Sequence, residues 1–152
     1  THGRRRRVAS ALTTAIRSAM ATEKKEAPNA LPVAVVLVLH GMFLSGCGYF
    51  GAAQHEFAPK AMHSLYAGTG AGAALAICGL LAISGSYKLY MIGVHLALLL
   101  EALFLVVFGV QAFRSYGAPE KEDRLPLFTA MFTGTFVAIL ALRVLKPKKK
   151  AA

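Results

Sequence analysis

Residues 89–113 read LYMIGVHLALLLEALFLVVFGVQAF, an apolar run that decides the fold of this chain. The run has 25 residues, includes one formal charge at Glu101, and contains no Pro, Asn or Asp. A helix of that length reaches about 37 Å, enough to cross a hydrocarbon core of about 30 Å with some tilt. Its apolar residues occupy every face, so neither a surface helix nor an alternating strand fits. We therefore predict a membrane span.

The composition of the whole chain supports this interpretation. Of 152 residues, 56% are hydrophobic and 16% are charged, and the mean hydropathy is +0.54. Soluble domains carry about a quarter charged residues, so a membrane protein is favoured. We predict an all-α fold, an integral membrane four-helix bundle with a basic amphipathic N-terminal segment.

Three further segments resemble the first, and polar connections or turns separate them. They fit into one membrane domain, residues 31–146, because four spans of this size leave little of the chain over. A basic arm precedes this domain and a basic tail follows it. In order, the predicted segments are the arm 1–30, the spans 32–53, 61–84, 88–113 and 125–145, and the tail 147–152.

The net charge of +10 comes mainly from the two ends of the chain. Seven of the 17 Lys and Arg residues precede residue 26, and five lie at or after Arg143. Because they flank an apolar body, we expect them to bind anionic membrane lipids or an acidic protein partner, and not nucleic acid. The residues assigned to this role are Arg4, Arg5, Arg6, Arg7, Arg17, Lys148, Lys149 and Lys150.

Residues 1–30 have the composition of an organelle-targeting region, rich in Arg, Ser, Thr and Ala and without an acid before Glu23. On a helix, their apolar residues would share a face opposite Arg7 and Arg17 and could lie on a membrane surface. A disordered basic tail is the alternative. Because basic tails need a surface on which to dock, residence in a larger assembly is favoured. Since the first residue is Thr1, we expect a processed or trimmed chain.

The distribution of basic residues also predicts an orientation. With four spans, both ends of the chain and the turn at 84–88 share one side of the membrane. That side holds thirteen Lys and Arg residues, and the other holds four. The positive-inside rule then places both termini in the matrix or stroma, for a protein of the mitochondrial inner membrane or a plastid membrane.

Small residues recur at helical spacing in the second span. Gly68, Gly72, Ala76 and Gly79 are separated by four, four and three residues. Such spacing lets helix backbones approach closely. The first span carries a similar stripe that includes Gly48, and the fourth span offers a third. We expect these residues to pack the helices of the bundle, with a transport groove as the alternative.

Glu101 is the charged residue deep inside a span. A charged side chain at mid-membrane costs about 2.5–3.5 kcal/mol on insertion scales, so Glu101 should be neutral, paired or facing a polar cavity. We group it in an intramembrane polar site with His95, six residues earlier, and with His40, a candidate partner from a neighbouring helix. Three interpretations remain: a structural or interface hydrogen bond, a proton or substrate site, and a ligand to haem or chlorophyll.

The sequence contains no constellation that predicts catalysis or metal binding. It has no nucleophile with a base in a soluble context and no phosphate-binding loop, so we expect no catalytic residues, no metal site and no enzyme. Residues 46–51 match G-x-G-x-x-G, but they lie near the end of a membrane span and lack the strand that a dinucleotide site requires. No cofactor is firmly implied. Bound lipid is expected, with chlorophyll or haem as alternatives.

Short motifs follow one another from His40 to the fourth span. They are Gly46-x-Gly48-Tyr49, then Ser64-Leu65-x-Ala67-Gly68 with Gly72, then Gly109, Phe113 and Tyr116, and finally Pro126. In these motifs the chain resembles the transmembrane-protein-fourteen family, which includes the plastid fatty-acid-export proteins. The resemblance implies a small four-span protein of an organelle inner membrane that carries lipids, fatty acids or porphyrins.

Two functions follow from these observations. The first is a non-catalytic accessory or structural subunit of a large organellar energy-converting membrane complex, such as an ATP synthase, a respiratory complex or a photosystem, with other membrane subunits as partners. The second is the small carrier that the family resemblance implies. In a carrier, Glu101 and the small residues of the second span should line a cavity. In a subunit, the same residues should be packed.

Overall fold

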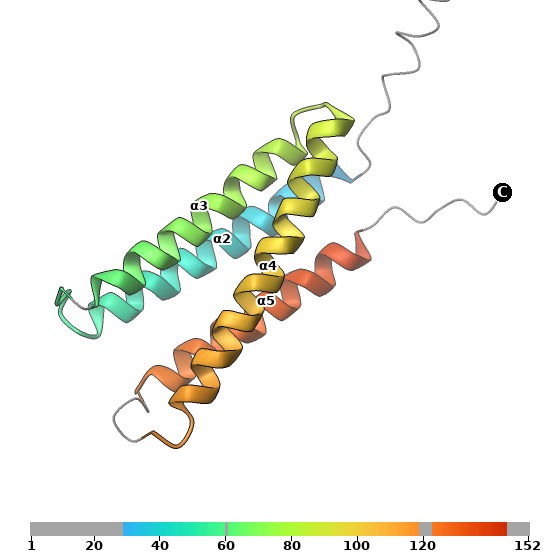
Figure 1. Cartoon of the computed structure of the whole chain (residues 1–152). Coiled ribbons are helices and arrows are strands. Elements are labelled where there is room, and N and C mark those ends of the chain that lie inside the picture. Colours follow the sequence, from blue (N-terminus) through green and yellow to red (C-terminus); the bar gives the residue numbers. More distant parts are fainter. Residues whose placement is uncertain (1–28, 60, 119–122, 146–152) are drawn as a thin grey trace, which may run out of the picture.

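The computed structural model describes residues 29–59, 61–118 and 123–145, which form four helices and no strands. The helices are α2 (Ala30–Ala53), α3 (Met62–Ala82), α4 (Tyr87–Ser115) and α5 (Leu125–Val144). They run alternately in opposite directions (Figure 1), and each is long and apolar enough to cross a membrane. The predicted all-α four-helix membrane bundle is confirmed. The amphipathic arm and the basic tail lie outside the described residues, as do all eight basic residues assigned to lipid or partner binding.

Each helix boundary falls within two residues of the predicted span. Helix α2 begins earlier than predicted, directly after Asn29, whose φ of 55° is left-handed. Pro32 lies in its first turn, where backbone N–H groups have no partner within the helix, so the N–H that proline lacks is not needed. Helix α4 continues past Phe113 to Ser115 and stops before Gly117, whose φ of 75° is readily adopted only by glycine.

Helices α2 and α3 contact each other through their backbones. A Cβ added to Gly48 would lie 2.7 Å from the carbonyl oxygen of Ser64 and 2.9 Å from the Cα of Gly68. A Cβ added to Gly41 would lie 2.6 Å from the carbonyl oxygen of Gly72. Real Cβ atoms do not approach backbone atoms so closely, so only glycine fits at these positions. This close approach allows dispersion contacts along both helices, which is how helices associate in lipid.

In the small-residue stripe predicted on α3, Gly68, Gly72 and Gly79 are buried against α2. Ala76, the remaining residue of the stripe, is half-buried, and its neighbour Leu75 lies in the core. The reason is that α4 packs on the other side of α3, where Gly93 approaches the backbone of Cys78. The core therefore extends around α3 toward Leu75 and away from Ala76.

The two ends of the described bundle lie together. Asn29 Nδ2, just before α2, donates a hydrogen bond of 2.9 Å to the carbonyl oxygen of Leu145, just after α5. Both described ends of the chain therefore emerge on one side (Figure 1), as an even number of spans requires. At the opposite end, His55 Nε2 lies 3.6 Å from Asp123 Oδ2.

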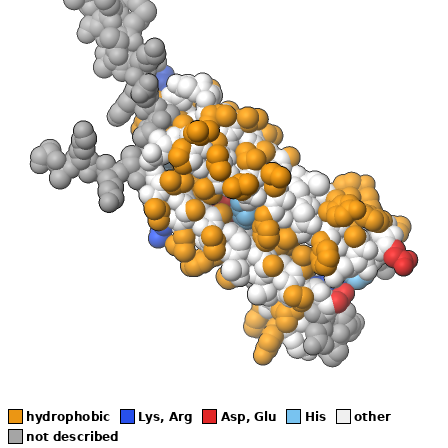
Figure 2. All heavy atoms as spheres, turned by 180° about the vertical axis from the view of Figure 1, so that it is seen from behind, with side chains coloured by type: hydrophobic (Ala, Val, Ile, Leu, Met, Phe, Trp, Pro, Cys, Tyr) orange, Lys and Arg blue, Asp and Glu red, His pale blue; other side chains and the backbone are white. Residues whose placement is uncertain are grey.

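The outer surface of the bundle is apolar, as Figure 2 shows for one face. On α3 and α4, Leu80, Leu99 and Val106 are 62%, 68% and 63% exposed. A soluble domain rarely leaves large contiguous apolar surfaces in contact with water, whereas lipid tails cover them without cost. The fold is therefore that of a multi-pass membrane protein.

The α2–α3 contact can be tested with two alanine substitutions on the same helix. Gly68→Ala should lower the free energy of unfolding by about 1–3 kcal/mol, because its Cβ would lie 2.7 Å from the carbonyl oxygen of Leu44. Gly70→Ala is the control, because a Cβ there meets nothing within 4 Å. The measurement is unfolding by denaturing detergent in mixed micelles. Equal stability of the two variants would contradict the packing described here.

Candidate functional site: a buried polar contact between three helices

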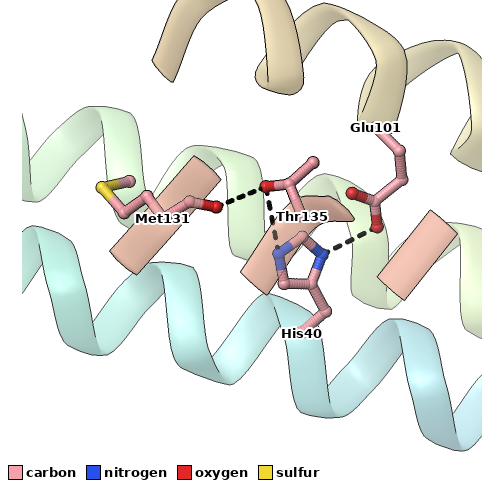
Figure 3. A network of polar contacts seen from close by, with 4 residues as sticks. All are labelled: His40, Glu101, Met131 and Thr135. Atoms are coloured by element: carbon pink, nitrogen blue, oxygen red, sulfur yellow. Dashed lines mark hydrogen bonds and ion pairs between the residues drawn. The ribbon is translucent and has the colours of Figure 1, made fainter. Parts of the chain in front are cut away.

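Three polar side chains from three helices meet in the centre of the bundle (Figure 3). His40 of α2 is 6% exposed, and Glu101 of α4 and Thr135 of α5 are both 0% exposed. The Nδ1 of His40 lies 2.7 Å from the Oε1 of Glu101, and its Nε2 lies 3.4 Å from the Oγ1 of Thr135. The imidazole ring thus joins α4 and α5 to α2.

The helices bring these residues to similar depths. His40 lies ten residues after Ala30, and Thr135 lies nine residues before Val144, at the same end of the bundle. At 1.5 Å per residue these positions are about 15 Å and 14 Å deep, near the middle of a hydrocarbon core of about 30 Å. Glu101 lies fourteen residues into α4, the longest of the described helices.

The hydrogen-bond pattern assigns the hydrogens of the imidazole ring. Thr135 Oγ1 donates to the carbonyl oxygen of Met131 at 2.8 Å. A hydroxyl has one hydrogen, so toward His40 it can only accept, and the Nε2 of His40 must carry a hydrogen. The contact of 2.7 Å between Nδ1 and Oε1 then needs one further proton. Whether that proton is on the carboxyl or on the ring, the His40–Glu101 pair as a whole is neutral.

The second oxygen of Glu101 has no hydrogen-bond partner. Among the described residues, Oε2 of Glu101 is the buried side-chain nitrogen or oxygen atom left without one. Leaving a buried polar atom unpaired costs about 1–3 kcal/mol, and a charged one costs more. Such an atom calls for a functional or structural explanation, because buried polar atoms in folded proteins are nearly always paired.

The structure brings together two of the three residues grouped from the sequence. His40 is the partner of Glu101, whereas His95 is exposed and its Nδ1 lies 2.7 Å from the carbonyl oxygen of Met91, one turn earlier on α4. Grouping His95 with Glu101 was wrong, because six residues along an α-helix turn the side chain by about 240°, away from the bundle centre.

Thr135 was not predicted. Two other threonines of the fourth span, Thr129 and Thr133, donate to the carbonyl oxygens of Leu125 and Thr129, both at 2.8 Å, and lie outside this site. The signal that could have identified Thr135 is its depth in the membrane. Thr135 lies nine residues before the end of α5, and His40 lies ten residues after the start of α2, at the same end of the bundle.

A groove of about 960 Å³ runs between α2 and α5 beside this site. His40 lines it together with Val36, Leu39 and Phe43 of α2, and its α5 wall extends from Leu125 to Ala141. Figure 2 shows one face of the bundle, on which a histidine side chain lies among apolar side chains. Apart from His40, the polar side chains of the lining are the two threonines that donate to their own helix, so the groove is adapted to an apolar occupant.

Within the described ranges, no group of three His, Cys, Asp or Glu side chains is arranged to hold a metal ion. Axial ligation of haem or chlorophyll needs a ring nitrogen with a free lone pair. Both ring nitrogens of His40 are engaged by Glu101 and Thr135, so the site as built does not offer one.

Comparison with known proteins adds no relative. The chain matches no protein-family model, no curated protein and no solved structure. The resemblance to the transmembrane-protein-fourteen family therefore stays a prediction. The fold itself defines the class, a multi-pass all-helical membrane protein with one buried polar contact among its described residues that joins three helices.

Two histidines of the bundle provide a matched test of the site. His40→Ala should lower the free energy of unfolding by about 1–3 kcal/mol, because it leaves the Oε1 of Glu101 buried without a partner. His95→Ala should have a much smaller effect, because His95 is exposed and its Nδ1 hydrogen-bonds within its own helix. Unfolding in mixed micelles measures both. A larger loss for His95→Ala than for His40→Ala would contradict the assignment.

Proposed function

We propose that this chain is a non-catalytic accessory subunit of a large energy-converting membrane complex in an organelle. The observation that carries the proposal is that the residues a carrier would use to line a cavity are packed. Gly68 and Gly72 contact the backbone of α2, and Glu101 is 0% exposed. A pathway along these residues would require the α2–α3 contact to separate.

The groove between α2 and α5 supports a lateral partner. Ala130, Gly134 and Ala138 line it from α5 at spacings of four residues, the arrangement that lets another helix approach closely. Its α5 wall, from Leu125 to Ala141, is about 24 Å long at 1.5 Å per residue and so covers most of the hydrocarbon core. A membrane helix of a neighbouring subunit has the length and the apolar surface to fill it.

The charged ends of the sequence support the same proposal. Thirteen Lys and Arg residues fall on the side of the membrane that also holds both termini in a four-span arrangement. Such a concentration of charge suits docking on acidic partner subunits or on anionic lipids of the matrix or stromal leaflet. We propose that the protein resides in the mitochondrial inner membrane or a plastid membrane.

A small lipid, fatty-acid or porphyrin carrier is the second candidate. The groove of about 960 Å³ favours it, because an apolar chain could lie along α5 with His40 beside it. The family resemblance points the same way. In that case the groove would bind a diffusing lipid, and it would not be permanently filled by a partner helix.

Native electrophoresis of mildly solubilised organelle membranes tests the subunit proposal. The chain should co-migrate with a complex many times its own 16.1 kDa, and mass spectrometry of the band should identify the partners. Removing residues 1–28, which lie outside the described helices, should weaken co-migration. Migration of the intact chain as a monomer or a small homo-oligomer would contradict the proposal.

Filling the groove distinguishes its two proposed occupants. Ala130→Phe should reduce assembly into the complex, because Ala130 is exposed within the groove. Ala102→Phe is the matched control, since Ala102 is exposed on α4 and does not line the groove. If Ala130→Phe leaves assembly intact but slows fatty-acid transfer in proteoliposomes, the carrier is the correct function. In that case Glu101→Gln should also impair transfer.

A further inference from the structure

The His40–Glu101 pair has a property that an accessory subunit does not require. The hydrogen on His40 Nε2 is fixed by Thr135, and the contact of 2.7 Å between Nδ1 and Oε1 holds one further proton. We infer that this pair is a proton-binding site at mid-membrane, in which Glu101 is a neutral carboxylic acid that donates its hydrogen to His40. The inference goes beyond the proposed function and does not depend on it.

The unpaired oxygen of Glu101 decides where the proton resides. In an ion pair, Oε2 would carry about half of a negative charge, without a donor and out of reach of water. In the neutral form the same atom is an uncharged carbonyl oxygen, which loses far less when a hydrogen bond is missing. An apolar surrounding therefore favours the O–H···N form over the N–H⁺···O⁻ form.

The groups around the pair provide no compensating charge. The Thr135 hydroxyl of α5 is uncharged. The titratable side chain buried near Glu101 is the Cys78 thiol of α3, which is uncharged when protonated. The described Lys and Arg residues lie at the helix ends: Lys88, Arg114, Arg124 and Arg143. Nothing charged in the described bundle therefore lies at the depth of the pair to stabilise a carboxylate.

Occupancy by one proton keeps the pair between α2 and α4 neutral. Loss of the proton would leave one negative charge in the bundle centre. A second proton would leave one positive charge there, as an imidazolium whose Nδ1 donates to a neutral carboxyl group. His40 also lines the α2–α5 groove, so the groove is the side from which a proton carrier such as water could reach the ring.

The test is the protonation state of Glu101 in the intact protein, reconstituted in lipid nanodiscs at neutral pH. Infrared difference spectroscopy of the native chain against Glu101→Gln should isolate a carbonyl band of a protonated carboxyl. A carboxylate band in its place would overturn the inference.

A second measurement does not depend on that variant folding. Nitrogen-15 NMR of the native chain with labelled histidine should show one buried ring as a neutral imidazole with its hydrogen on Nε2. The signal is assigned to His40 if it is missing from the spectrum of His40→Ala. An imidazolium with hydrogens on both nitrogens would overturn the inference. As a control on structure, Glu101→Gln should keep the native unfolding midpoint, because an amide can donate to Nδ1, whereas Glu101→Leu should lower it.

Discussion

The contact of 2.7 Å between His40 Nδ1 and Glu101 Oε1 closes the bundle. The main helix contacts run around a ring, from α2 to α3, α4, α5 and back to α2. His40 and Glu101 reach across the diagonal of this ring, between two helices that otherwise touch little. In lipid, no hydrophobic force gathers helices, so specific polar and packing contacts must fix their positions. Through Thr135, the same imidazole ring also fixes α5.

The glycine contacts complement this polar contact. Gly48 and Gly68 bring α2 and α3 together along their backbones, and Gly93 does the same for α3 and α4. Helix α5 has no comparable glycine contact with α2: a Cβ at Gly134 would meet the ring of Phe43 rather than backbone. The α2–α5 side is accordingly where the groove opens, and Thr135 is the polar residue that joins α5 to His40 on that side. The least tightly closed side of the bundle is therefore the side proposed to receive a partner.

The sequence predicted the spans well because long apolar runs leave a chain in lipid little choice but helix. It also predicted Gly48, Gly68 and Gly72 as contact residues, because small residues at a spacing of four mark one helix face. It did not predict how each helix is rotated about its own axis, because apolar residues on every face carry no amphipathic signal. That is why His95 was grouped with Glu101 and why Thr135 was not foreseen.

The central claim is that the His40–Glu101 contact stabilises the bundle across its diagonal. A double-mutant cycle with His40→Ala, Glu101→Ala and the double variant measures this contact directly in mixed micelles. We predict a coupling energy of about 1 kcal/mol or more, in the upper part of the range for interhelical hydrogen bonds in membranes. Losses that add within about 0.3–0.5 kcal/mol would show that the two side chains act independently and would contradict the account.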